Sequence, residues 1–302
     1  MPAERPAATL SRSLKPGERP RRSRARGRIA LLSVLAVVGT AGWFGATELI
    51  DALRSPQCTV TAAGASETFD PEQAGNAALI TALAVKRGMP PRAATIALTT
   101  AYQESKILNI TYGDRDSLGL FQQRPSQGWG TEEQILDPVY STNKFYDALV
   151  KLKGYEDADI TEIAQKVQRS AHPELYRDHE GQGRVLASAL TGHSPAGLTC
   201  RLDDHPEGKA PATPATLSTV RADLATQMGV TTAVQSEQSE RTLTVTAPDV
   251  RIAWAVGHWA VARAEQYGAT EVRVGDRAWD RTDGDEGWSA GTASRTVLIT
   301  LG

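Results

Sequence analysis

The feature that most constrains this chain is an uncharged stretch near its start. Residues 29–47, IALLSVLAVVGTAGWFGAT, contain no Asp, Glu, Lys or Arg. As a helix this stretch would rise about 28 Å, close to the ~30 Å hydrocarbon thickness of a bilayer. We therefore predict one membrane-spanning helix over residues 29–49, with Trp43 and Phe44 near its outer interface.

The charges on either side of this segment predict its direction. Residues 1–28 hold nine Lys and Arg and two Asp and Glu, whereas the rest of the chain holds 24 basic and 33 acidic residues. Because basic flanks stay cytoplasmic, we expect residues 1–28 to be a cytoplasmic tail of a single-pass protein of the cell membrane. The acidic remainder would lie outside, and its charge argues against a nucleic-acid partner.

Three alternatives to an uncleaved membrane anchor stay open. A cleaved signal peptide would have an apolar run of about 7–15 residues and a small-residue cleavage site, and neither is present. A lipoprotein anchor at Cys58 is disfavoured because Ser-Pro-Gln precedes that cysteine. A buried helix of a globular domain is disfavoured by the nine basic residues before it.

The two cysteines predict the limits of the first extracytoplasmic domain. An oxidising location favours a disulfide between Cys58 and Cys200, which would clasp a domain over residues 55–202. In the chain-entropy model such a long loop contributes about 4–5 kcal/mol. Two buried free thiols are the alternative.

The region 55–202 is predicted to be mainly helical. Asp70 and Pro71 are typical of a helix start, and the apolar period runs to Gly88. A second helix starts at Pro91, and little of the region alternates like a strand. Further helices are expected at residues 132–136, 138–153, 160–170 and 182–191.

The composition changes after residue 202. Residues 203–216 are rich in Pro, Ala and Thr and predict a linker. Residues 217–302 predict a small α/β domain. Its expected elements are a helix over 249–267 and strands at 242–246, 271–274 and 296–300. The predicted fold class is therefore α+β multidomain, with a single N-terminal transmembrane helix, a mainly α domain and a small C-terminal α/β domain.

A candidate for acid–base chemistry lies at the end of the second predicted helix. Glu104 follows small and apolar residues and precedes a polar loop. A carboxyl held against apolar side chains resists ionisation, and a raised pKa suits a general acid near neutral pH. An ordinary surface glutamate at a helix end is the alternative on position alone.

The neighbourhood of Glu104 contains several motifs in a characteristic order. The motifs are Gln103-Glu104-Ser105, Gly119-Leu120-Phe121-Gln122, Gln123-Arg124-Pro125, Leu136-Asp137-Pro138 and Asn143. This order resembles the lysozyme-like superfamily, and the similarity is to soluble lytic transglycosylases and goose-type lysozymes over about residues 70–195.

The loop Arg124–Gly130 is similar to actinobacterial membrane-anchored lysozyme-like proteins that are sometimes labelled heavy-metal transporters. We discount transport because one spanning helix cannot form an alternating-access pathway.

The resemblance implies cleavage of peptidoglycan. Glu104 would protonate the glycosidic oxygen between N-acetylmuramic acid and N-acetylglucosamine. In transglycosylases the C6 hydroxyl of the substrate then attacks, so no second carboxylate is required, whereas a hydrolase would need one to position water. The residues expected to contact the glycan or orient the acid are Ser105, Asp114, Asp116, Gln122, Gln123, Trp129 and Gln168.

Four of these positions have alternatives. The family carries Ala-Tyr-Asn-Ala-Gly, whose tyrosine hydrogen-bonds the acid, but the aligned helix here has no tyrosine, so either Gln168 serves or the acid is tuned differently. Asp114 and Asp116 would position water in a hydrolase, or form an Asx-type turn paired with Arg115. Trp129 is either a platform for a sugar or a filler of the core.

No metal or cofactor is expected. The histidines lack the spacing of a zinc site. A calcium loop starting at Asp114 fails because Leu118 and Pro125 stand at ligand positions five and twelve.

The leading hypothesis is a membrane-anchored, cell-wall-facing enzyme that acts on peptidoglycan glycan strands. The alternatives are a catalytically silent peptidoglycan-binding or cell-envelope scaffold protein, and an adaptor acting through the C-terminal domain. The C-terminal domain carries a pattern of Trp254, Trp259, Gly268, Val272 and Trp279. This pattern looks like a small domain found on actinobacterial secreted cell-wall proteins, so a cell-envelope protein is its expected partner.

Overall fold

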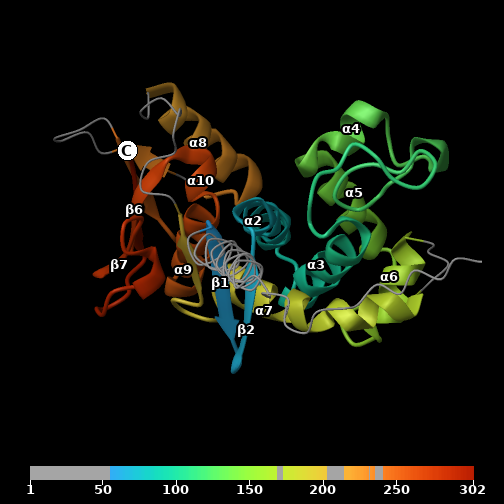
Figure 1. Ribbon diagram of the computed structural model, residues 1–302, viewed down its shortest axis with the longest axis horizontal. Coiled ribbons are helices and arrows are strands. Elements are labelled where there is room, and N and C mark those ends of the chain that lie inside the picture. Colours follow the sequence, from blue (N-terminus) through green and yellow to red (C-terminus); the bar gives the residue numbers. More distant parts are fainter. Residues whose placement is uncertain (1–54, 169–172, 203–213, 231, 235–240) are drawn as a thin grey trace, which may run out of the picture. The chain divides into compact units, whose positions relative to one another are not determined.

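The computed structural model describes residues 55–168, 173–202, 214–230, 232–234 and 241–302 (Figure 1). Within these ranges the fold is mixed α+β with two antiparallel sheets. None of the helices in these ranges combines the length and hydropathy that a bilayer span demands. The predicted span 29–49 and the basic tail 1–28 lie outside the described residues.

The first part of the chain is mainly helical, as predicted. The helices expected from Pro71 and Pro91 are confirmed, and the one expected at 138–153 ends earlier, at Leu149. The helix expected at 160–170 is confirmed as far as the described residues reach, to Gln168. Pro71 stands at the first position of its helix, and the amide of Asp70 donates to the side chain of Gln73 (2.9 Å), which satisfies one free donor of the helix start. The helices are α2 (Pro71–Lys86), α3 (Pro91–Ser105), α4 (Glu132–Leu136), α5 (Pro138–Leu149), α6 (Ile160–Gln168) and α7 (Glu180–Leu190), with 3-10 helices η1 (Pro125–Gln127) and η2 (Pro173–His179).

A three-stranded sheet accompanies these helices and was missing from the sequence prediction. Its strands are β1 (Gln57–Ala62), β2 (Ala65–Phe69) and β3 (Leu198–Arg201), in the order β2-β1-β3. In β1 the buried Cys58, Val60 and Ala62 alternate with less buried residues, which is the period of a strand with one face in the core. The alternation was present in the sequence but spans only six residues.

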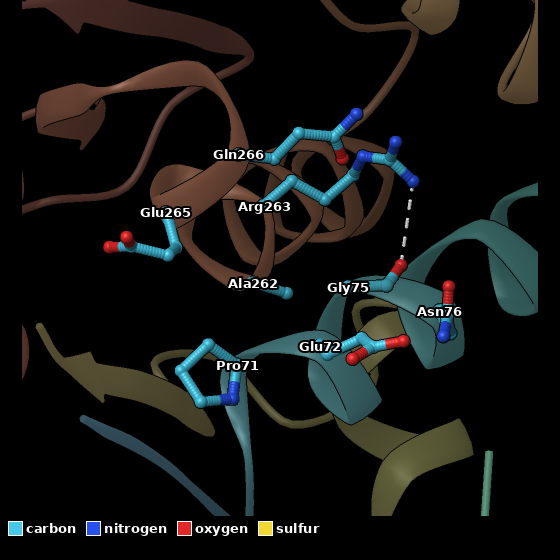
Figure 2. A pocket seen from close by; sticks show the side chains of 8 residues that line it. All are labelled: Pro71, Glu72, Gly75, Asn76, Ala262, Arg263, Glu265 and Gln266. Carbon is cyan, nitrogen blue, oxygen red and sulfur yellow. Dashed lines mark hydrogen bonds between the residues drawn. The ribbon is translucent and has the colours of Figure 1, made fainter. Parts of the chain in front are cut away.

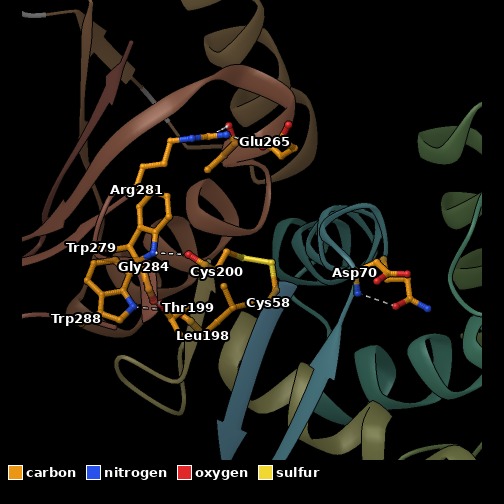
Figure 3. Close-up of a disulfide and its surroundings, with 12 residues drawn as sticks. Cys58, Asp70, Leu198, Thr199, Cys200, Glu265, Trp279, Arg281, Gly284 and Trp288 are labelled. Atoms are coloured by element: carbon orange, nitrogen blue, oxygen red, sulfur yellow. Dashed lines mark hydrogen bonds and ion pairs between the residues drawn. A yellow bond between two sulfur atoms is a disulfide. The ribbon is translucent and has the colours of Figure 1, made fainter. Parts of the chain in front are cut away.

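The predicted disulfide is confirmed (Figure 3). Cys58 in β1 lies directly opposite Cys200 in β3, and both residues are fully buried. The indole nitrogen of Trp279 donates to the carbonyl of Cys200 (3.1 Å), and that of Trp288 donates to the carbonyl of Leu198 (2.8 Å). The C-terminal part of the chain therefore packs onto the strand that carries the second cysteine.

The last part of the chain is an α/β layer. The strands expected at 242–246, 271–274 and 296–300 are confirmed, whereas the helix expected over 249–267 is divided at Arg263. The sheet order is β4-β5-β8-β6-β7. The elements are α8 (Pro214–Gln227), β4 (Thr232–Val234), β5 (Thr242–Thr246), α9 (Val250–Ala262), α10 (Ala264–Tyr267), β6 (Ala269–Val274), β7 (Arg277–Asp280), η3 (Gly284–Glu286) and β8 (Thr296–Leu301).

Helix α9 links this layer to the helical part. It packs against α2, α7 and β3 as well as β6 and β8. Nδ1 of the buried His258 donates to the carbonyl of Ala189 in α7 (2.8 Å), and burial lowers the pKa of His258 to about 4, which keeps the ring neutral. Residues 55–302 accordingly form one compact unit. The predicted linker lies mostly outside the described residues, and α8 begins within it, at Pro214.

A cavity of about 310 Å³ lies where α2 meets the end of α9 and α10 (Figure 2). The guanidinium of Arg263 reaches across and donates to the carbonyl of Gly75 at 3.5 Å. Arg263 also donates to the hydroxyl of Tyr267 (3.0 Å), so this buried charge is held by both regions of the unit. Helix α2 is thereby fixed from the C-terminal side.

Candidate active site

Glu104 lies on the last turn of α3, where the helix leaves the core. The residues before it, Ile96, Ala97, Leu98 and Ala101, are completely buried, and α3 packs along α7. Glu104 itself is half-buried. Its carboxylate therefore sits at the boundary between an apolar interior and solvent, as the sequence predicts.

Two side chains contact the carboxylate of Glu104. The hydroxyl of Tyr176 donates to Oε1 at 2.5 Å, and the side chain of Gln168 also forms a hydrogen bond with Glu104. Burial raises the pKa of Glu104, and the two hydrogen bonds from Tyr176 and Gln168 partly oppose that rise because they stabilise the charged form. The net shift is upward, which increases the protonated fraction near neutral pH.

Tyr176 is the site residue that the sequence reasoning missed. It is almost fully buried in η2, eight positions beyond Gln168, and its contact with Glu104 spans 72 residues of chain. Gln168 is the last described residue of α6. Its Nε2 donates to the carbonyl of Phe121, so this side chain contacts the turn opposite as well as the acid. No spacing in the sequence marks Tyr176; the only signal is a tyrosine within a polar stretch.

The backbone immediately after Glu104 is strained. Lys106 and Ile107 have φ values of 58° and 59°, a left-handed conformation that is unfavourable for a β-branched residue. The side-chain amide of Gln73 donates to the carbonyl of Lys106, and that of Asn76 donates to the carbonyl of Ile107, both at 2.9 Å. Helix α2 thus holds the sharp turn that fixes the end of α3, and with it Glu104.

Ser105 joins α3 to the Gly119–Gln122 turn. Its buried hydroxyl donates to the carbonyl of Leu120 at 2.8 Å. The turn itself is closed by reciprocal backbone hydrogen bonds between Leu118 and Gln123, each of 3.0 Å. Gly119 has a φ of 74°, and a Cβ there would lie 2.9 Å from the carbonyl oxygen of Ile135. Ser105 therefore positions the turn beside the acid.

The two glutamines that end this turn have different surroundings. Gln122 is half-buried with a φ of 46°, and its Nε2 lies 3.2 Å from the carbonyl oxygen of Tyr112. Gln123 is buried and donates to the carbonyl of Ser141 at 3.1 Å. Of the two, Gln122 is the more exposed, and its side chain holds the Tyr112 backbone.

The predicted aspartates also differ. Both carboxylate oxygens of Asp116 are engaged: Oδ2 accepts from the amide of Ser126 (2.8 Å), and Oδ1 accepts from Nε of Arg124 (2.7 Å). These two contacts hold the pKa of Asp116 well below its usual range. Asp114 is 88 % exposed and lies 3.9 Å from Arg115. Asp116 thus acts as a clamp, because it ties its own loop to the backbone and side chain of the segment Arg124–Ser126. Asp114 is the more accessible carboxylate.

Trp129 packs against the hydrophobic core and is half-buried. Its two glycine neighbours have φ values of 81° and 144°. The indole therefore contributes to packing at the edge of the domain, and part of it faces solvent.

Within the described ranges, no three His, Cys, Asp or Glu side chains gather as a metal site would require. Comparison with known proteins finds no matching family model and no matching curated protein. The lysozyme-like resemblance therefore rests on the motifs themselves.

Proposed function

We propose that this protein is a membrane-anchored, extracytoplasmic enzyme that cleaves the bond between N-acetylmuramic acid and N-acetylglucosamine in peptidoglycan. The observation that carries the proposal is the half-buried Glu104 carboxyl, whose raised pKa and hydrogen bond from Tyr176 suit a general acid. The ordered motifs from Glu104 to Asn143 add support.

One carboxyl group, that of Glu104, can act first as the acid and then as the base of the reaction. Protonated Glu104 gives its proton to the glycosidic oxygen as the bond to the anomeric carbon breaks, which leaves an oxocarbenium-like centre and a carboxylate. The hydroxyl of Tyr176 stabilises that carboxylate. The carboxylate then takes the proton of the attacking hydroxyl, and the acid is restored.

We infer that the attacking group is the C6 hydroxyl of the same sugar. Asp116 is bound to Arg124 and the amide of Ser126, so it is poorly suited to accept a proton from water. Asp114 is 88 % exposed, so bulk water surrounds it and no enclosed site orients one attacking water molecule against it. The expected product is therefore a 1,6-anhydromuramic end.

The decisive variant is Glu104→Gln, which keeps the shape of the side chain and removes the acid. General acid–base catalysis contributes about 10²–10⁴-fold, so release of fragments from purified sacculi should fall by that order. Binding to sacculi should survive. Glu133→Gln, which removes an exposed carboxylate from α4, is the matched control and should retain activity.

Mass spectrometry of the products then tests the chemistry. Anhydro ends support intramolecular attack, whereas reducing ends would replace it with a water mechanism and return attention to Asp114. Wild-type protein that binds sacculi yet releases neither product between about pH 4.5 and 8 would overturn catalysis and favour the silent binding or scaffold function.

The proposed topology has its own test. Protease added to intact spheroplasts should degrade residues 55–302 and spare the basic tail 1–28. Protection of residues 55–302 would contradict the extracytoplasmic location.

A further inference from the structure

We infer that Tyr112 is the stacking platform of a glycan subsite next to Glu104. This inference rests on the proposed function and names a residue that holds the substrate. Tyr112 is 72 % exposed, the most exposed of the large apolar side chains in the described part of the chain. A single exposed tyrosine is ordinary on a protein surface. The argument therefore depends on how its loop is held.

The backbone beside Tyr112 is packed tightly against the Gly119–Gln122 turn. Nε2 of Gln122 donates to the carbonyl of Tyr112. A Cβ on Gly113 would lie 2.7 Å from the carbonyl oxygen of Ser117, a backbone atom that cannot easily move aside, so glycine suits this position. The same turn is bound to the end of α3 by Ser105, so Tyr112 has a short connection to the backbone of Glu104.

The rest of the loop is rigid and strained. Arg115 has a φ of 56°, and the amide of Ser117 donates to the carbonyl of Asp114 at 3.0 Å, which closes a tight turn. Asp116 then ties the loop to Arg124 and Ser126. Backbone strain that the surroundings hold in place is common at ligand sites, and this strain lies within four residues of the exposed ring.

A rigid aromatic ring that faces solvent suits one class of ligand in this setting. The C–H face of a sugar ring is flat and apolar, and an aromatic face can cover it without a large loss of side-chain entropy. Tyrosine also carries a hydroxyl that can contact the sugar hydroxyls. Asp114 and Arg115, two and three residues further along the loop, are both highly exposed and can meet the polar edge of the glycan.

The test uses the detergent-solubilised full chain in the Glu104→Gln background, so that the glycan is not cleaved while binding is measured. Cosedimentation with purified sacculi gives the affinity. Tyr112→Ala should weaken binding about three- to ten-fold, the range expected for loss of one aromatic contact. Tyr112→Trp should restore it. Val250→Ala removes another exposed apolar side chain, on α9, and should leave binding unchanged.

The outcomes separate this inference from the proposed function. Equal binding by Tyr112→Ala and its Glu104→Gln parent would overturn the platform while the catalytic proposal stands. Failure of Tyr112→Trp to bind better than Tyr112→Ala would also overturn it. A parent that does not bind sacculi, together with a wild type that releases no product, would remove the proposed function and this inference with it. Because Tyr112 is exposed, the Tyr112 variants should have the same melting temperature as the Glu104→Gln parent.

Discussion

The hydroxyl of Tyr176 lies 2.5 Å from the carboxylate of Glu104, although the two residues are 72 positions apart in the chain. One comes from a 3-10 helix and the other from the end of α3. The proposed acid is therefore tuned by two opposing effects, because burial raises its pKa while this hydrogen bond lowers it. Removing either effect should change the pKa of Glu104 measurably.

Tyr176→Phe should raise the pKa of Glu104 further, since it removes a donor that stabilises the carboxylate. The alkaline limb of the pH profile for sacculus cleavage should then move to higher pH. The maximal rate should fall about ten-fold or more, the value of a hydrogen bond to a charged group. Tyr102→Phe makes the same chemical change two residues before Glu104 and should leave the limb in place. An unshifted limb in Tyr176→Phe would contradict this role.

Glu104 should also make folding stability depend on pH. Its folded-state pKa is raised above the ordinary 4.5, so the folded state binds the proton more tightly than the unfolded chain does. Stability is then lost as pH rises from about 4.5 through the folded pKa, by about 1.4 kcal/mol for each tenfold difference in proton affinity between the two states. Glu104→Gln should therefore be more stable than the wild type at pH 7.5 but not at pH 4. Chemical denaturation at both pH values gives the free energy of unfolding of the wild type and of Glu104→Gln. The same difference between the two proteins at pH 4 and pH 7.5 would contradict the prediction.

The disulfide should contribute strongly to stability. Cys58 and Cys200 close a loop with a sequence separation of 142, so replacing both with serine should lower the free energy of unfolding by about 2–5 kcal/mol. Chemical denaturation of the full chain would show this loss. Intact mass should rise by two hydrogens per chain on reduction. Full thiol labelling after denaturation without reductant would show that the bond does not form in the purified protein.

The two loop aspartates should behave differently. Asp116→Asn removes the charge that holds Arg124 and the amide of Ser126, so the loop that carries Tyr112 should loosen and glycan binding should weaken. Asp114→Asn leaves that clamp intact and should cost little. Binding curves with purified sacculi give the affinities of the two variants side by side. A larger effect from Asp114→Asn would instead support a direct role for Asp114.

In the first part of the chain, local rules predicted the helices but not the strands. Helix α2 carries its own signals, with Asp70 and Pro71 at its start and basic residues at its end, so its position follows from nearby residues. Strand β1 pairs with β3, which lies about 140 residues later, and its six residues have too little alternation to stand out. Its stability comes from a partner that local sequence does not reveal.

The candidate site shows the same division. Glu104 could be found because helix period and motif order both mark it. Tyr176, Gln73 and Asn76 could not, since each acts through a contact made by a different element. The family pattern has its tyrosine on the helix that corresponds to α6, where we expected Gln168 to serve, and the structure adds a tyrosine hydroxyl from η2 to the contact of Gln168. A tyrosine hydroxyl can reach one carboxylate from several backbone positions, so its chemical role does not fix its place in the sequence.

The disulfide also has a mechanical consequence. If residues 29–49 hold the protein in the bilayer while a glycan strand holds it to the wall, tension enters the fold through the first residues of β1. Cys58 is the second residue of that strand, and its bond to Cys200 transfers the load to β3 through a covalent link. The pull would pass to β3, which packs against α9, before it could separate β1 from its neighbours. A protein tethered in this way stays folded while the wall and the membrane move apart.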